Sequence, residues 1–167
     1  MAYALAGRHS EGIESAQEGV RRGQELRLTR FQPLRVTLLA NAYLVAGRYA
    51  EALAAARDAL ELARRYHERG PEAWAIYLMT ESMAQLPGTE QKEIHDNYLA
   101  ALKLAEELNM RPLVAHCQLG LGALNARLGD TVRAREKINT ALSTYRELDM
   151  QFWPEKAETA LKKLSSQ

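Results

Sequence analysis

Apolar residues recur at helical spacing along the chain and are interrupted at regular intervals. The clearest example lies between residues 34 and 63, where two apolar stripes are separated by Gly47. The first stripe consists of Leu34, Leu38, Leu39, Ala42 and Val45, and the second of Ala52, Leu53, Ala56, Leu60 and Ala63. Spacings of three and four residues place side chains on one face of a helix. This segment therefore predicts two amphipathic helices joined by a tight turn, that is, a helical hairpin.

The hairpin pattern repeats along the whole chain. Small residues that follow each turn stand at Gly19, Ala59, Ala101 and Ala141, in steps of 40, 42 and 40 residues. Prolines mark a similar period, because Pro33, Pro71, Pro112 and Pro154 are separated by 38, 41 and 42 residues. Since proline is tolerated in the first turn of a helix, each of these four is expected near a helix start. The fifth proline, Pro87, stands with Gly88 in a predicted break between helices.

The turns and the facing positions of each hairpin carry residues that fit these roles. A glycine such as Gly47 is expected in the left-handed conformation that ends a first helix, and Asp130 is expected to cap a second one. Small residues are expected where the two helices of a hairpin approach each other most closely. They are Ala40 with Ala52 and Ala59, and Gly122 with Ala134 and Ala141.

A single hairpin cannot bury both of its apolar stripes, whereas a stack of hairpins can. The sequence therefore predicts an all-α fold, a right-handed α-α superhelix of helical hairpins, as a single domain over residues 1–167. Its units are expected at 32–70, 71–110 and 111–150, followed by a capping helix at 153–164 with Lys162 and Lys163 toward solvent. Residues 1–31 are expected to hold a truncated unit, because MAYALA before Gly7 matches only the end of a first helix.

The hairpin residues resemble the tetratricopeptide repeat. The run Leu39, Ala40, Tyr43, Gly47, Tyr49, Ala52, Ala59 and Leu60 is similar to the consensus of that family, and Leu121, Gly122, Gly129, Ala134, Ala141 and Leu142 repeat it. Because the period exceeds the family's usual length of about 34 residues, the second helix of each hairpin is expected to be about two turns longer. The resemblance implies a groove that is lined by the first helix of each hairpin and holds a partner.

A narrower resemblance covers roughly residues 71–164. The segment NYLAALKLAEELNMRPLVAHCQLGLGALNARLGD, followed by YRELDMQFW, is similar to the C-terminal repeat arrays of large bacterial signalling proteins. Those proteins carry an adenylate or guanylate cyclase domain and an ATPase domain before the repeats. The resemblance implies that this chain is the regulatory piece of something larger. One departure is Asn109, which stands where those proteins have glycine; asparagine also adopts the left-handed conformation.

Charge and composition narrow the class of partner. The chain has 22 Lys and Arg against 21 Asp and Glu, a formal net charge of +1. Such a balance disfavours binding to nucleic acid or to an anionic membrane. No apolar run is long enough to span a membrane, and a single cysteine, Cys117, excludes an internal disulfide. These features favour a soluble protein of the reducing cytoplasm.

No group of residues indicates catalysis, so neither an enzymatic activity nor a cofactor is predicted. His116 and Cys117 are neighbours on a helix and point about 100° apart, so they do not converge on a metal ion. Cys117 is expected in the core rather than as a nucleophile. Gly120 and Gly122 lack the third glycine of a phosphate loop, and close helix packing explains them better. Acidic residues such as Glu51, Asp58 and Glu61 are expected on a solvated helix face.

The predicted groove takes its residues from the first helix of each unit. They are Leu34, Thr37, Asn41 and Leu44, then Trp74, Tyr77 and Glu81, then His116, Leu119 and Arg127. Aromatic, amide and charged side chains together suit the binding of a peptide or a helix. The alternative for Trp74 and Tyr77 is a place in the core between repeats. Chaperone-tail binding is not expected, because only Asn41 fits the basic clamp that grips a terminal carboxylate.

Three interpretations of function follow from this groove. The first is a non-catalytic protein–protein interaction or scaffold module, which binds a segment of another protein or of its own parent chain. The second is a regulatory array in which a small effector fills the groove and changes the output of a cyclase or an ATPase. The third is self-association through the exposed ends of the array.

Overall fold

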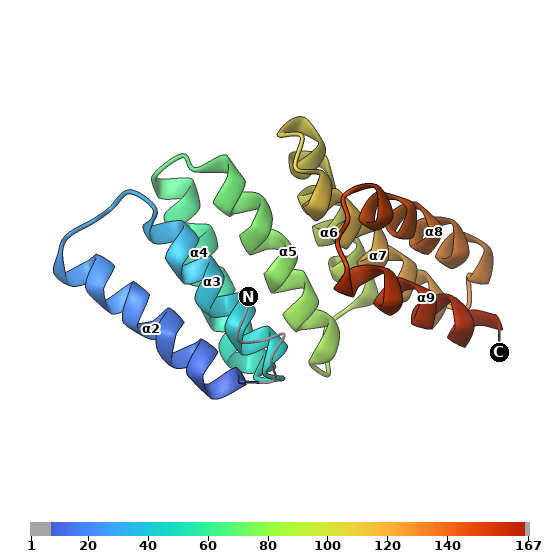
Figure 1. Ribbon diagram of the computed structural model, residues 1–167, viewed down its shortest axis with the longest axis horizontal. Coiled ribbons are helices and arrows are strands. Elements are labelled where there is room, and N and C mark those ends of the chain that lie inside the picture. Colours follow the sequence, from blue (N-terminus) through green and yellow to red (C-terminus); the bar gives the residue numbers. More distant parts are fainter. Residues whose placement is uncertain (1–7, 166–167) are drawn as a thin grey trace. The chain divides into compact units, whose positions relative to one another are not determined.

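The computed structural model describes residues 8–165, which form eight helices and no strand (Figure 1). The helices are α2 (His9–Glu25), α3 (Gln32–Val45), α4 (Tyr49–Arg65), α5 (Arg69–Gln85), α6 (Gln91–Glu107), α7 (Arg111–Arg127), α8 (Thr131–Glu147) and α9 (Phe152–Ser165). The predicted all-α fold is confirmed. The predicted first helix end in MAYALA and Gly7 lies outside the described residues.

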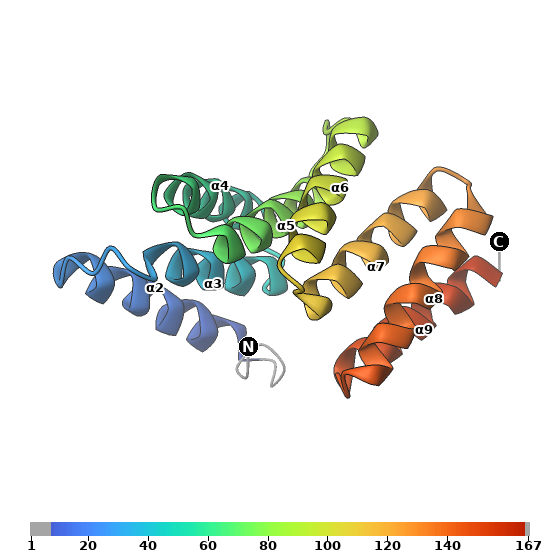
Figure 2. The same ribbon diagram turned by 90° about the horizontal axis from the view of Figure 1, so that it is seen from above.

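Contacts between helices divide the chain into two compact units. Unit 1 ends at Glu90, and within it α3 packs against α2, α4 and α5. Unit 2 begins at Gln91, and within it α7 packs against α6, α8 and α9, as Figures 1 and 2 show. In each unit, consecutive helices pack against one another as in a helical solenoid. The boundary falls inside the unit expected at 71–110, and one continuous array of repeats stays a prediction.

The prolines that were expected near helix starts lie in the first turn of a helix. Pro33 and Pro112 occupy the first two positions of α3 and α7. Pro71 is the third residue of α5, and Pro154 is the third residue of α9. Pro87 follows the end of α5, in the predicted break.

The predicted helix ends and the predicted cap are also confirmed. Gly47, Gly88 and Gly129 have positive φ angles of 73°, 86° and 80°, which glycine adopts without the clash of a Cβ atom. Asn109 has a φ of 54°, in agreement with its expected role in place of glycine. Asp130 caps α8, because its Oδ1 accepts a hydrogen bond of 3.0 Å from the backbone N–H of Arg133.

The first apolar stripe is not buried, contrary to the expectation that both stripes of the hairpin are covered. Leu34, Leu38 and Val45 are 39%, 51% and 44% exposed on α3. The buried face of α3 is instead formed by Gln32, Pro33, Val36, Thr37 and Ala40. Helix α3 is apolar on both faces, so its smaller side chains pack inward against α2, α4 and α5 while Leu34 and Leu38 face outward.

Small residues do bring neighbouring helices close together. Ala40, Ala52 and Ala59 are fully buried in unit 1. In unit 2, a Cβ atom added at Gly120 would lie 2.5 Å from two ring carbons of Tyr98 on α6. One added at Gly122 would lie 2.5 Å from Ile138 Cγ1 and 3.2 Å from the carbonyl oxygen of Ala134. Close packing of the two glycines, as predicted, is therefore confirmed.

The two helices of the last predicted hairpin have the same length. In the unit predicted at 111–150, α7 and α8 contain 17 residues each. In this unit the second helix is as long as the first, and its greater length relative to the tetratricopeptide repeat stays a prediction. None of the helices in residues 8–165 has the length and apolar character needed to cross a membrane.

Candidate protein-binding groove

The ten residues predicted to line a groove lie on α3, α5 and α7. Leu34 and Arg127 are exposed. Asn41, Leu44, Trp74 and Glu81 are half-buried, and Thr37, Tyr77, His116 and Leu119 are buried. The four buried residues offer little surface to a partner, so a binding role for them has no support in their positions.

Thr37 and Tyr77 are both buried, and their side chains make different contacts. The Thr37 hydroxyl donates a hydrogen bond of 2.8 Å to the carbonyl oxygen of Pro33, one turn earlier in α3. Tyr77 is 7% exposed, and its ring meets that of Trp74 edge to face, with centroids 5.9 Å apart. Burial of Tyr77 agrees with the alternative of a core position, whereas Trp74 keeps part of its surface.

His116 lies in a buried aromatic cluster that joins α7, α8 and α9. Its Nδ1 atom is 2.8 Å from the hydroxyl oxygen of Tyr145, and its ring centroid is 4.2 Å from that of Trp153. Burial, and to a smaller extent the charge of Lys156, lower the pKa of His116 to about 4. The imidazole is therefore neutral at pH 7, and its place is in the core of unit 2.

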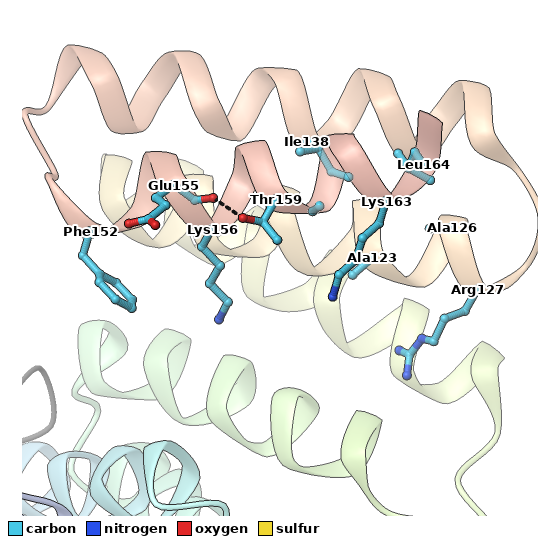
Figure 3. Close-up of a pocket in the computed structure, with 11 residues that line it drawn as sticks. Ala123, Ala126, Arg127, Ile138, Phe152, Glu155, Lys156, Thr159, Lys163 and Leu164 are labelled. Carbon is cyan, nitrogen blue, oxygen red and sulfur yellow. Dashed lines mark hydrogen bonds between the residues drawn. The ribbon is translucent and has the colours of Figure 1, made fainter. Parts of the chain in front are cut away.

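A groove of about 580 Å³ lies between α7, α8 and α9 in unit 2 (Figure 3). Its apolar lining is formed by Ala123, Ala126, Ile138, Phe152, Ala160 and Leu164. Phe152 stands at one end of the groove and Arg127 at the other. Apolar walls between packed helices provide a surface on which an apolar side chain of a partner is shielded from water.

Cationic side chains outnumber carboxylates around this groove. Arg127, Lys156 and Lys163 line it together with a single acid, Glu155, and all four are exposed. Figure 3 shows the three cations extending to the same side of α7 and α9. The Thr159 hydroxyl donates a hydrogen bond of 2.8 Å to the carbonyl oxygen of Glu155. The groove is therefore basic at its rim.

Packing within unit 2 holds one of these cations in place. The Lys156 Nζ atom lies 5.0 Å from the centroid of the Trp153 ring, at a distance where a cation is attracted to the ring face. Trp153 in turn packs on His116. The aromatic cluster thus contacts one residue of the rim, Lys156, although His116 itself does not line the groove.

Sequence reasoning found only one of the groove residues, Arg127. Because the sequence predicts residues 153–164 as a solvent-facing capping helix, Phe152, Lys156 and Lys163 are not among the predicted groove residues. A signal was present, because these three residues are spaced by four and seven positions and share one face of α9. The sequence alone does not predict that this face of α9 lies beside the end of α7.

The structure gives no support to chemistry at Cys117 or at a metal centre. Cys117 is fully buried in α7. Within residues 8–165, no three His, Cys, Asp or Glu side chains are arranged to hold a metal ion.

No protein-family model matches this chain, and no curated protein matches it either. Membership of the tetratricopeptide family stays a prediction that depends on the residues quoted for it.

Proposed function

We propose that this chain is a non-catalytic protein-interaction module that binds a short extended segment of a partner protein in the groove between α7, α8 and α9. The observation that carries the proposal is the combination of an apolar lining with three cationic side chains in one groove. Apolar side chains of the segment lose water against residues such as Ile138 and Leu164. Carboxylates of the segment meet Arg127, Lys156 and Lys163.

The length of the groove sets the length of the segment. Helix α9 lines it from Phe152 to Leu164, and a helix rises about 1.5 Å per residue, so the groove is about 18 Å long. An extended chain covers about 3.3 Å per residue. The groove therefore accommodates five or six residues of a partner, roughly, in extended conformation.

Apolar contact and charge have different parts in this binding. An exposed ion pair contributes only about 0.2–1 kcal/mol, since both charges remain hydrated. Burial of one aliphatic side chain contributes about 1.5–3 kcal/mol. Affinity is therefore expected to come from the apolar lining, while the cations select acidic segments and speed their association.

Selection from a library of random hexapeptides on the immobilised full chain tests the proposal. The selected peptides are expected to combine an aliphatic residue with Asp or Glu. The double substitution Lys156→Glu with Lys163→Glu is expected to weaken their binding at least about tenfold, because it reverses the charge of the rim. The matched control is Lys92→Glu with Lys103→Glu, which reverses two exposed lysines on α6 outside the groove. Equal binding by both double variants would contradict the assignment of the groove.

A small effector in the same groove is the second candidate. A volume of about 580 Å³ falls within the range of about 300–1,000 Å³ that ligand pockets occupy. A thermal-shift screen of metabolites distinguishes the two candidates, because a ligand at a hundred times its dissociation constant stabilises the protein by about 2.7 kcal/mol. Stabilisation by a metabolite that Lys156→Glu with Lys163→Glu abolishes, without any selected peptide, would favour the effector.

The proposal includes a regulatory role in a larger bacterial signalling protein. This part of it depends on the sequence resemblance alone. That resemblance lies in residues 71–164, which include the whole of unit 2 up to α9. On this resemblance, the segment that the groove binds belongs to a neighbouring domain of the parent protein or to a protein that controls it.

A further inference from the structure

An apolar ridge runs along the outer face of α3 in unit 1. Phe31, Leu34, Leu38 and Val45 are 53%, 39%, 51% and 44% exposed. Leu34, Leu38 and Val45 are spaced by four and seven residues, which places them within about 40° of one another around the helix axis, and Phe31 is the residue directly before the helix, with a φ of 63°. Four large apolar side chains therefore form one continuous stripe toward solvent, which we call the α3 ridge.

The α3 ridge is not a part of the unit's own packing. The opposite face of α3 carries the buried Val36, Thr37 and Ala40, and α2, α4 and α5 pack against this helix. Single exposed leucines are common on protein surfaces, whereas a contiguous stripe marks a site of interaction. A stripe at this spacing matches the stripe of a second amphipathic helix.

The charges around the α3 ridge are basic. Between Leu26 and Arg48 the chain contains three arginines, Arg27, Arg30 and Arg35, and neither Asp nor Glu. The guanidinium of Arg30 lies 5.4 Å from the centroid of the Phe31 ring, and Arg35 donates a hydrogen bond of 3.3 Å to the carbonyl oxygen of Arg30. One carboxylate approaches this end of the ridge from another element, because Glu68 accepts a hydrogen bond of 3.3 Å from the Phe31 backbone N–H.

This charge pattern selects among possible occupants. A second copy that docks in parallel through the same ridge would place arginines against arginines, which costs binding energy, and an antiparallel copy would bring no carboxylate from residues 27–47 to them. A helix with acidic residues beside its apolar stripe, at the end that lies near the start of α3, pairs with Arg27, Arg30 and Arg35 instead. We propose that the α3 ridge is a docking site for an acidic amphipathic helix of a partner protein. This site is formed by residues of unit 1, whereas the peptide groove is formed by residues of unit 2.

The size of the α3 ridge defines the helix. From Phe31 to Val45 the ridge extends about 21 Å along the axis, which is about four helical turns. A suitable probe is a labelled peptide of about 18 residues, slightly longer than the ridge, with Leu at every third and fourth position and Glu beside them. A second peptide, for comparison, has Lys in place of Glu. Fluorescence anisotropy with the full chain measures the affinity of both.

The Glu-flanked peptide is expected to bind at least about tenfold more tightly than the Lys-flanked one. Leu38→Glu is expected to abolish this binding, whereas Leu128→Glu, at an equally exposed leucine in unit 2, is expected to leave it unchanged. Arg27→Glu with Arg30→Glu is expected to remove or reverse the preference for the acidic peptide. Circular dichroism of each variant checks that the helices remain folded.

Several results would overturn the proposal. Equal binding of the two peptides, no binding of either, or insensitivity to Leu38→Glu would each do so. Loss of binding in the groove variant Lys156→Glu with Lys163→Glu would assign the peptide to unit 2 instead. Binding of the full chain to vesicles rich in phosphatidylserine, lost in Leu38→Glu while the peptides do not bind, would assign the ridge to a membrane surface. A concentration-dependent dimer that Leu38→Glu abolishes would assign it to a second copy.

Discussion

Unit 2 is expected to lose stability between pH 7 and pH 5, because His116 is buried in its neutral form. The pKa of His116 is about 4 in the folded protein, whereas an exposed histidine titrates near 6.5. Between these values the unfolded chain binds a proton that the folded chain does not bind. The free energy of unfolding therefore falls as the pH falls through this window and is unaffected by His116 above it.

The magnitude follows from the two pKa values. Lowering the pH from 7 to 5 is expected to remove about 2 kcal/mol, and at pH 4 the loss reaches about 3 kcal/mol. Exposed carboxylates also titrate near the lower end of this range, so a reference that lacks only the imidazole is required. His116→Asn is suitable, because its amide keeps a polar atom near the Tyr145 hydroxyl and does not titrate.

The two tryptophans allow unit 2 to be observed alone. Trp74 lies in unit 1 and Trp153 packs on His116 in unit 2. In a Trp74→Phe background, urea unfolding followed by Trp153 fluorescence at pH 7 and pH 5 gives the free energy of unfolding around the cluster. The loss is expected to be about 2 kcal/mol larger with His116 than with Asn at this position. A loss of free energy of unfolding between pH 7 and pH 5 that is the same in the two proteins, to within about 0.5 kcal/mol, would refute the argument. Any destabilisation by His116→Asn that does not depend on pH cancels in this comparison.

Two further predictions concern packing and capping. Gly120→Ala is expected to destabilise unit 2 by about 1–3 kcal/mol, because the Tyr98 ring has to move. Gly19→Ala in α2, with no atom within 4 Å of the added Cβ, is expected to stabilise unit 1 by about 0.5–1 kcal/mol. Urea unfolding measures the stability of both glycine variants. A change of the same sign in the two variants would contradict the reasoning. Asp130→Ala is expected to cost about 1 kcal/mol through the lost cap of α8. Asp58→Ala, at an exposed position within α4, is the thermal-denaturation control, and equal shifts in melting temperature would count against the cap.

The helices and turns could be predicted from sequence because their signals are local. Pro33 and Pro112 fix the start of a helix through the fixed φ of proline, wherever that helix packs. Gly47 and Gly129 end a helix because a positive φ suits glycine. Turns without glycine gave no such signal: His67 and Asp149 also have positive φ angles, of 55° and 51°.

The direction in which α3 faces could not be predicted in the same way. Its sequence offers Leu34, Leu38 and Val45 on one face and Val36 and Ala40 on the other, so apolar periodicity does not decide which face is buried. Which face of α3 is buried depends on the neighbouring helices. Alanines such as Ala52 and Ala59 on α4 bring the two helices so close that only small side chains of α3 fit between them. The larger leucines are left outside, which is why the α3 ridge exists.

The small net charge of the chain does not indicate its two basic surfaces. A net charge of +1 disfavours an anionic partner only if the charges are evenly spread, and they are not. Some carboxylates pair with an arginine nearby in sequence, as Glu51 does with Arg48 at 2.7 Å and Glu61 with Arg65 at 2.6 Å. The groove of unit 2 and the α3 ridge keep an excess of cations. Because salt screens charges beyond about 10 Å, an acidic segment responds to these local surfaces and not to the sum over the chain.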